Sequence, residues 1–236
     1  MAKGFFDTFH AFYRTSSVGS SPNRLNGRYR VLIEEHLPVI RGKAVLDLAC
    51  HDGRWSFAAY KAGARHVIGI EARERLVHAA RANLREYCLL EDQVTIVQGD
   101  IYDVLSAFEP GEIDTVLCLG FFYHTLHHMR LLHLLARLCA CHVLIDTAIT
   151  KSAVAAIRLR HEKAENEANA FAPGREDALV GVPSKAALEQ MLRYAGFGFS
   201  FYDWHNGKQE SWEGLEDYRE RRRVSLLATN LAKAGK

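Results

Sequence analysis

Three acidic residues each end a short apolar run: Asp47 in AVLDLA, Glu71 in HVIGIEA and Asp100 in VTIVQGD. A carboxylate has two acceptor oxygens, so one that follows a strand can accept hydrogen bonds from both hydroxyls of a ribose. The turn after the first run must let a ligand approach the backbone, which favours small residues such as Ala49 and Gly53. These residue types in this order predict a site for a ribose-containing ligand.

The segments that position these residues alternate between apolar runs and amphipathic stretches. Short Val/Ile/Leu-rich runs predict strands at 44–49, 66–72, 94–100, 114–120 and 142–147. Helical spacing of apolar residues predicts helices at 30–40, 53–64, 73–87 and 129–138. This alternation predicts an α/β fold with a doubly wound, mostly parallel, Rossmann-like sheet and helices on both faces. Ligands of such sheets bind beyond the carboxyl ends of the strands.

The rest of the chain completes this domain. A helix at 183–197 and strands at 199–204 and 223–229 bring the expected sheet to seven strands, with the last one antiparallel. We expect the domain to cover 31–236, with 151–183 as a substrate-side insertion that is helical first and then loop-like. We expect 1–30, which is rich in aromatic residues and has a polar break at 16–23, to form a lid that excludes water from the pocket.

Composition excludes several classes of protein. The chain is 48% hydrophobic and 25% charged, which rules out wholesale disorder, and its net charge of +2 is too low for a dedicated nucleic-acid binder. Five cysteines without a CxxC pair argue against a disulfide framework and a zinc site. We expect a cytoplasmic protein without a membrane span or a bound metal.

The order of elements from about 31 to 150 resembles that of the class I S-adenosylmethionine-dependent methyltransferases. In that family the first loop usually reads D-x-G-x-G-x-G, and here it reads Asp47-Leu-Ala49-Cys-His51-Asp-Gly53. Ala49 and His51 replace the first two glycines. The corresponding loop of a nicotinamide enzyme needs glycines where the pyrophosphate touches the backbone, so the methyl-donor family is the better match.

The resemblance implies S-adenosylmethionine as the cofactor and assigns its contacts by segment. The turn after the first strand would meet the methionine end, the acid after the second strand would hold the ribose, and the residues after the third strand would meet the adenine. The segment LGFFYHT, at 119–125, would run past the methyl group. The implied cofactor-binding residues are Asp47, Ala49, Cys50, His51, Gly53, Glu71, Ala72, Asp100, Ile101 and Leu119.

The expected reaction is transfer of a methyl group to an O or N atom of a small-molecule acceptor. His124 is the candidate general base, because it lies just beyond the fourth strand, and Tyr123 is a candidate orienting hydroxyl. Two alternatives stay open. LGFFYHTLHH is also similar to a stretch of the tRNA wobble-uridine carboxymethyltransferases, which would make the acceptor a nucleic acid, and the altered first loop leaves room for a non-catalytic cofactor-binding module.

Overall fold

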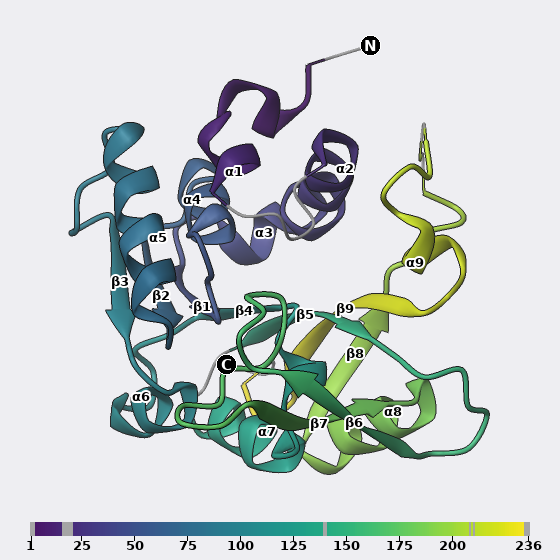
Figure 1. The fold of residues 1–236 in the computed structure, drawn as a ribbon. Helices are drawn as coiled ribbons and strands as arrows, with labels where there is room; N and C mark the ends of the chain where they lie inside the picture. Colours follow the sequence, from purple (N-terminus) through teal and green to yellow (C-terminus); the bar gives the residue numbers. More distant parts are fainter. Residues whose placement is uncertain (1–2, 16–20, 139–140, 208, 210, 234–236) are drawn as a thin grey trace.

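A seven-stranded sheet forms the centre of the computed structural model, which describes residues 3–15, 21–138, 141–207, 209 and 211–233 (Figure 1). The strand order is β3-β2-β1-β4-β5-β9-β8. The strands are β1 (Ala44–Leu48), β2 (His66–Glu71), β3 (Val94–Gln98), β4 (Thr115–Leu119), β5 (His142–Ala148), β8 (Phe197–Phe201) and β9 (Arg223–Asn230).

All pairs from β3 to β5 are parallel, and β9 runs antiparallel to both β5 and β8. This confirms the expected α/β fold class and the antiparallel last strand. The chain leaves β1 to one side to form β2 and β3 and returns on the other side to form β4. The order therefore reverses between β1 and β4, where a sheet of this type opens a crevice at its carboxyl edge.

Helices cover the sheet on both faces (Figure 1). One core layer packs α2 (Pro22–Leu32), α4 (Arg54–Lys61) and α5 (Glu74–Glu86) against strand residues such as Val45. The other packs α6 (Ile101–Ala107), α7 (His128–Arg137) and α8 (Lys185–Tyr194) against residues such as Leu46. Neighbouring residues of a strand point to opposite faces, so β1 is buried along its whole length and reads as a continuous apolar run.

The N-terminal segment packs differently from the lid that we expected. Phe6, near the start of η1 (Phe5–Thr8), and Phe12, in α1 (Ala11–Arg14), are fully buried in the same core cluster as Phe57 of α4. No residue from 3 to 15 lines the cavity described below, whereas Arg24 and Arg28 of α2 do. Of the predicted polar break, 16–20 lies outside the described residues.

The helix predicted over 30–40 begins earlier and is broken. Ser21 caps α2 by accepting from the backbone N–H of Arg24, and Pro22 occupies the first turn. The helix ends at Leu32 and is followed by η2 (Glu34–His36) and α3 (Leu37–Ile40). The Ser-Pro start signal lies inside the stretch that polarity alone indicated as a loop.

The prediction of a helix in the first part of the insertion at 151–183 is wrong. It contains β6 (Ile157–Lys163) and β7 (Asp177–Pro183), an antiparallel pair, where we expected a helix first. Helix propensity is a weak preference that pairing with a distant segment overrides. The short elements η3 (Phe122–His124) and α9 (Glu216–Arg219) complete the chain. Among the described residues, no helix has the length and apolarity needed to cross a bilayer.

Candidate functional site

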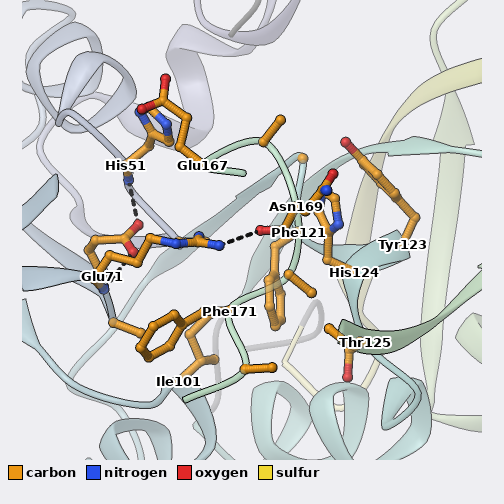
Figure 2. Close-up of a pocket in the computed structure, with 18 of the residues that line it drawn as sticks. His51, Glu71, Ile101, Phe121, Tyr123, His124, Thr125, Glu167, Asn169 and Phe171 are labelled. Atoms are coloured by element: carbon orange, nitrogen blue, oxygen red, sulfur yellow. Dashed lines mark hydrogen bonds between the residues drawn. The ribbon is translucent and has the colours of Figure 1, made fainter. Parts of the chain in front are cut away.

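A cavity of about 1090 Å³ opens at the carboxyl edge of the sheet. Figure 2 shows His51 and Glu71 on one side of it and Tyr123, His124 and Thr125 on the other. Nine of the residues predicted from the sequence line this cavity: Ala49, His51, Glu71, Ala72, Asp100, Ile101, Leu119, Tyr123 and His124. The expected segments therefore meet at one site.

The loop after β1 keeps a glycine-like backbone although two glycines are replaced. Ala49, His51 and Gly53 all have positive φ, at 52°, 57° and 79°. This left-handed conformation costs an L-residue roughly 1–2 kcal/mol, so Ala49 and His51 are held in it against local preference. The loop thus exposes its backbone to the cavity in spite of the altered sequence.

Glu71 is held by this loop and by the start of the next helix. Its Oε2 accepts from the backbone N–H of His51 at 3.0 Å, and its Oε1 accepts from the backbone N–H of Arg73 at 2.9 Å. The side chain is almost completely buried but lines the cavity. Each carboxylate oxygen has more than one acceptor direction, so the fixed carboxylate can still accept from two hydroxyls of a ligand.

Three of the predicted cofactor-binding residues, Asp47, Cys50 and Gly53, do not line the cavity. Asp47 is 1% exposed and accepts a hydrogen bond from Ser56 Oγ at 2.6 Å. Burial raises the pKa of Asp47 to about 7, against the effect of that hydrogen bond. A Cβ at Gly53 would lie 3.2 Å from the Cβ of Ala80, so the helix α5 packs closely there. Asp47 and Gly53 thus hold the ends of the loop against α4 and α5. Contact of these three residues with the cofactor stays a prediction.

Asp100 has a structural role that the sequence analysis missed. Its Oδ1 accepts from the backbone N–H groups of Tyr102 and Asp103, at 2.8 and 3.4 Å, and so caps α6. Within the described part of the chain, no hydrogen bond engages Oδ2. Because Asp100 lines the cavity together with Ile101, that oxygen is available to a ligand.

His124 is paired with a residue that sequence reasoning did not identify. Its Nδ1 lies 2.6 Å from Oε2 of Glu162 on β6, and that oxygen also accepts from the backbone N–H of Ala170 at 3.0 Å. Arg160 pairs with the other oxygen of Glu162. No signal could have indicated Glu162, because it belongs to the segment predicted as a helix.

The electrostatics of this pair fix the state of the imidazole. Burial lowers the pKa of His124 below its usual value of 6.5, and the interaction with Glu162 only partly opposes this. Although burial opposes ionisation of Glu162, its hydrogen bonds and the nearby charges lower its pKa to about 2. At neutral pH a neutral His124 thus donates from Nδ1 to an ionised Glu162. Nε2 then carries a lone pair and can accept a proton.

The loop between β6 and β7 covers part of the cavity and is held there by Arg73. The Arg73 guanidinium donates to the carbonyls of Ala164, Asn166 and Asn169, at 3.3, 3.3 and 2.9 Å, and lies over the ring of Phe171. The loop between β6 and β7 is thereby tied to the end of β2, beside Glu71. Residues of this loop line the cavity and form a roof over it, and its role on the substrate side stays a prediction.

A buried cluster of polar side chains surrounds Asp146, near the carboxyl end of β5. Arg28, Tyr218, Arg223 and Ser225 all donate to its carboxylate. Arg28 and Arg223 belong to RLNGRYR and RERRR, which composition alone favours as solvent-exposed faces. They are instead 7% and 8% exposed. Asp146, to which both arginines donate, lies more than seventy positions away from each of them. The residues near each arginine in sequence therefore do not indicate its burial.

Comparison with known proteins shows what the central part of the chain is similar to. The family model for the methyltransferase domain matches residues 45–142. This central part of the chain therefore resembles a methyltransferase domain, as the sequence predicted. This match covers the strands and loops that line the cofactor side of the cavity, and it supports the methyltransferase family and the S-adenosylmethionine cofactor expected from the sequence.

Curated methyltransferases match over part of their length. Protein arginine N-methyltransferase 1 of Schizosaccharomyces pombe is 32% identical over 94 residues, which are 40% of this chain and 27% of that protein. The ribosomal protein L11 methyltransferase of Prochlorococcus marinus is 38% identical over 87 residues, which are 36% of this chain and 28% of that protein. The chain therefore spans between a quarter and a third of the length of these two relatives.

Solved methyltransferase structures share the fold over most of the chain. An S-adenosylmethionine-dependent methyltransferase from Mesorhizobium loti superposes with a TM-score of 0.62 at 16% identity, over 87% of this chain and 99% of that one. The N-terminal domain of EvdMO1, solved with SAH bound, superposes with a TM-score of 0.60 at 18% identity, over 86% and 79%. At these identities the likeness concerns the fold.

The side chains that line the cavity suit S-adenosylmethionine, the cofactor of that family. The fixed carboxylate of Glu71 and the open oxygen of Asp100 are acceptors, as the ribose hydroxyls and the adenine amino group require. Nε2 of His51 is buried with no hydrogen-bond partner in the described chain, at the loop expected to meet the methionine end. An orphaned polar atom of this kind fits a polar ligand group.

Proposed function

We propose that the protein transfers a methyl group from S-adenosylmethionine to an O or N atom of a small molecule. The observation that carries the proposal is that His124, which is paired with Glu162, lines the same cavity as Glu71. One side of the cavity thus offers acceptors for an adenosyl group, and the other offers a base.

The cofactor half would bind through groups that are already fixed. Glu71 would accept from the ribose hydroxyls, Asp100 from the adenine amino group, and the Ala49–His51 backbone would lie along the methionine end. The bound cofactor supplies an electrophilic methyl group on a sulfonium. Because this leaving group is good, the protein contributes most by holding the nucleophile in line with the methyl group.

The proton of the nucleophile would pass to Nε2 of His124. Glu162 orients the imidazole through Nδ1 and stabilises the positive charge that it acquires. A positioned base of this kind contributes about 100- to 10,000-fold to a rate. Tyr123, which packs against the His124 ring at a centroid distance of 3.9 Å, is placed to orient the acceptor.

The roof over the cavity supports a small acceptor. The loop between β6 and β7 is tied to Arg73 by three hydrogen bonds, which limits the space above Glu71 and His124. A covered site also excludes water from the reacting atoms. The relatives include enzymes named for protein acceptors, so the acceptor class is what the experiment must decide.

Calorimetry tests the cofactor. We expect S-adenosylmethionine and S-adenosylhomocysteine to bind, and Glu71→Gln to weaken both about tenfold or more, because an amide has one acceptor oxygen fewer. Glu74→Gln is the matched control, since Glu74 is an exposed acid three positions away. Absence of binding by both compounds would overturn the proposal.

Labelled cofactor tests the acceptor. Radioactive S-adenosylmethionine is incubated with the protein and with separate small-molecule, protein and RNA fractions of a cell extract. We expect label in the small-molecule fraction. Label confined to RNA would favour the tRNA alternative, label confined to protein would indicate a protein acceptor, and cofactor binding without label in any fraction would favour the non-catalytic alternative.

A further inference from the structure

The acceptor side of the cavity contains more buried positive charge than negative charge. We propose that Arg28 and Arg223 form an anion subsite that binds a carboxylate of the acceptor. This inference rests on the proposed function and narrows its substrate to acidic small molecules.

Two guanidinium groups share a single carboxylate at this place. Arg28 Nη2 and Arg223 Nε both donate to Oδ1 of Asp146, at 3.1 and 2.6 Å. The other oxygen, Oδ2, accepts from the hydroxyls of Tyr218 and Ser225, each at 2.7 Å. Asp146 is therefore fully used and can neutralise only one of the two cations.

The surrounding groups do not supply the missing negative charge. Asp217 accepts two hydrogen bonds of 2.8 Å from Arg24 and also lies 4.0 Å from Arg223 Nε, so its single negative charge is already balanced by Arg24. Burial raises the pKa of Tyr218, so its hydroxyl stays neutral. The cluster of three arginines and two aspartates keeps one net positive charge, and an uncompensated charge at a buried site is strongly unfavourable.

Several N–H donors of Arg28 and Arg223 have no hydrogen-bond partner in the described part of the chain. Arg28 Nε is buried without a hydrogen-bond partner, and Arg28 is only 7% exposed. Within the described residues Arg223 donates through Nε alone, which leaves both terminal nitrogens without a partner. Both residues line the cavity. Guanidinium N–H groups in this arrangement match the two oxygens of a carboxylate.

The position of Arg223 assigns the subsite to the acceptor. A Cβ at Gly120, just after β4, would lie 3.5 Å from Arg223 Nη2. The Arg223 guanidinium also lies 5.3 Å from the centroid of the Tyr123 ring, next to His124. An acid bound here would therefore lie beside the general base. Arg28, which stacks on Trp55 at 4.9 Å, lies nearer the loop after β1, so the carboxylate of the cofactor is the competing source.

Calorimetry with benzoate distinguishes the two sources. Benzoate is titrated into protein loaded with S-adenosylhomocysteine, which has an amino-acid carboxylate, and into protein loaded with methylthioadenosine, which lacks one. We expect benzoate to bind both forms with similar affinity. We expect Arg223→Gln to weaken benzoate about tenfold or more and to leave the affinity for S-adenosylhomocysteine within about threefold.

Other outcomes would overturn the inference. Binding of benzoate to the methylthioadenosine form alone, with Arg223→Gln weakening S-adenosylhomocysteine, would assign the subsite to the cofactor. Absence of benzoate binding to both forms would remove the subsite and leave the proposed function intact. Failure of S-adenosylhomocysteine itself to bind would instead overturn the proposed function.

Two further measurements guard against a folding defect. Arg221→Gln removes the same charge from an exposed position two residues away, and we expect it to bind benzoate like the wild type. In the unaltered protein, benzoate should shift the Nε–Hε NMR signals of Arg28 and Arg223, which Arg28→Lys and Arg223→Lys assign, and leave that of Arg221 in place. Unshifted signals at saturating benzoate would contradict the subsite.

Discussion

The two halves of the cavity are built in different ways. On the cofactor side, the groups come from consecutive loops after β1, β2 and β3, and Glu71 is held by backbone N–H groups. On the acceptor side, Glu162 orients His124, and Asp146 joins Arg28 to Arg223, so side chains from distant segments hold one another. The order of strands and helices determines the position of the cofactor-side residues. The position of the acceptor-side residues depends on how α2, β6 and β9 pack onto the rest of the fold.

This difference has a functional consequence. Backbone donors bind the same group whatever the side chains are, so the loop after β1 keeps its conformation with Ala49 and His51 in place of glycine. Pairs of buried charges depend on each partner, because removal of one leaves the other uncompensated. Substitutions in the loop after β1 should therefore be tolerated, and substitutions in the charged pairs of the acceptor side should be costly.

The largest expected effect is on catalysis at the acceptor side. His124→Ala should lower kcat about 100- to 10,000-fold, because the proton of the nucleophile loses its acceptor, while affinity for the cofactor is retained. Turnover of the identified acceptor and calorimetry with S-adenosylhomocysteine measure the two effects. His127→Ala, an exposed imidazole at the same cavity, is the control. Unchanged turnover in His124→Ala would exclude the base.

Acid stability should depend on the partner of that base. The pKa of Glu162 is lowered from 4.5 to about 2, so its stabilising contribution is complete above about pH 4.5 and is lost as the pH falls toward 2. The contribution is at most about 3 kcal/mol. Glu162→Gln should flatten this part of the curve of unfolding free energy against pH. Equal slopes for Glu162→Gln and the wild type between pH 2 and 4.5 would contradict this account.

A smaller effect is expected where the two halves meet. Arg73→Met keeps a long side chain but removes the donors that hold the loop between β6 and β7, so amide hydrogen exchange in 164–172 should become about tenfold faster. Arg81→Met is the control, because Arg81 donates to the Ile96 carbonyl. Equal exchange rates in Arg73→Met and the wild type would show that other contacts hold the roof.

The smallest effect concerns the loop after β1. Ala49→Gly should raise the free energy of unfolding by up to about 1 kcal/mol, because relief of the left-handed strain exceeds the entropy that glycine loses on folding. Ala58→Gly in α4 should have the opposite sign, since Ala58 is helical and buried. Chemical denaturation measures both. A loss of stability in Ala49→Gly would mean that the loop is not strained at this position.

The sequence by itself determined the order of the seven strands of the central sheet and, with it, the cofactor side. A parallel strand that is buried on both faces must be apolar along its length, and polar residues that follow it must lie at the carboxyl edge. Glu71 and Asp100 could be found for this reason. The capping role of Asp100 could also have been anticipated, since an acid directly before a helix is a common start signal.

Only the tertiary structure decided the acceptor side. Glu162 reaches His124 because β6 pairs with β7, and helical propensity in a local window hid that pairing. Arg28 and Arg223 read as solvent-exposed charges until Asp146, at the end of a strand between them in sequence, buries both. Such contacts depend on which segments the fold brings together. The spacing of neighbouring residues therefore does not predict which distant charged residues will pair.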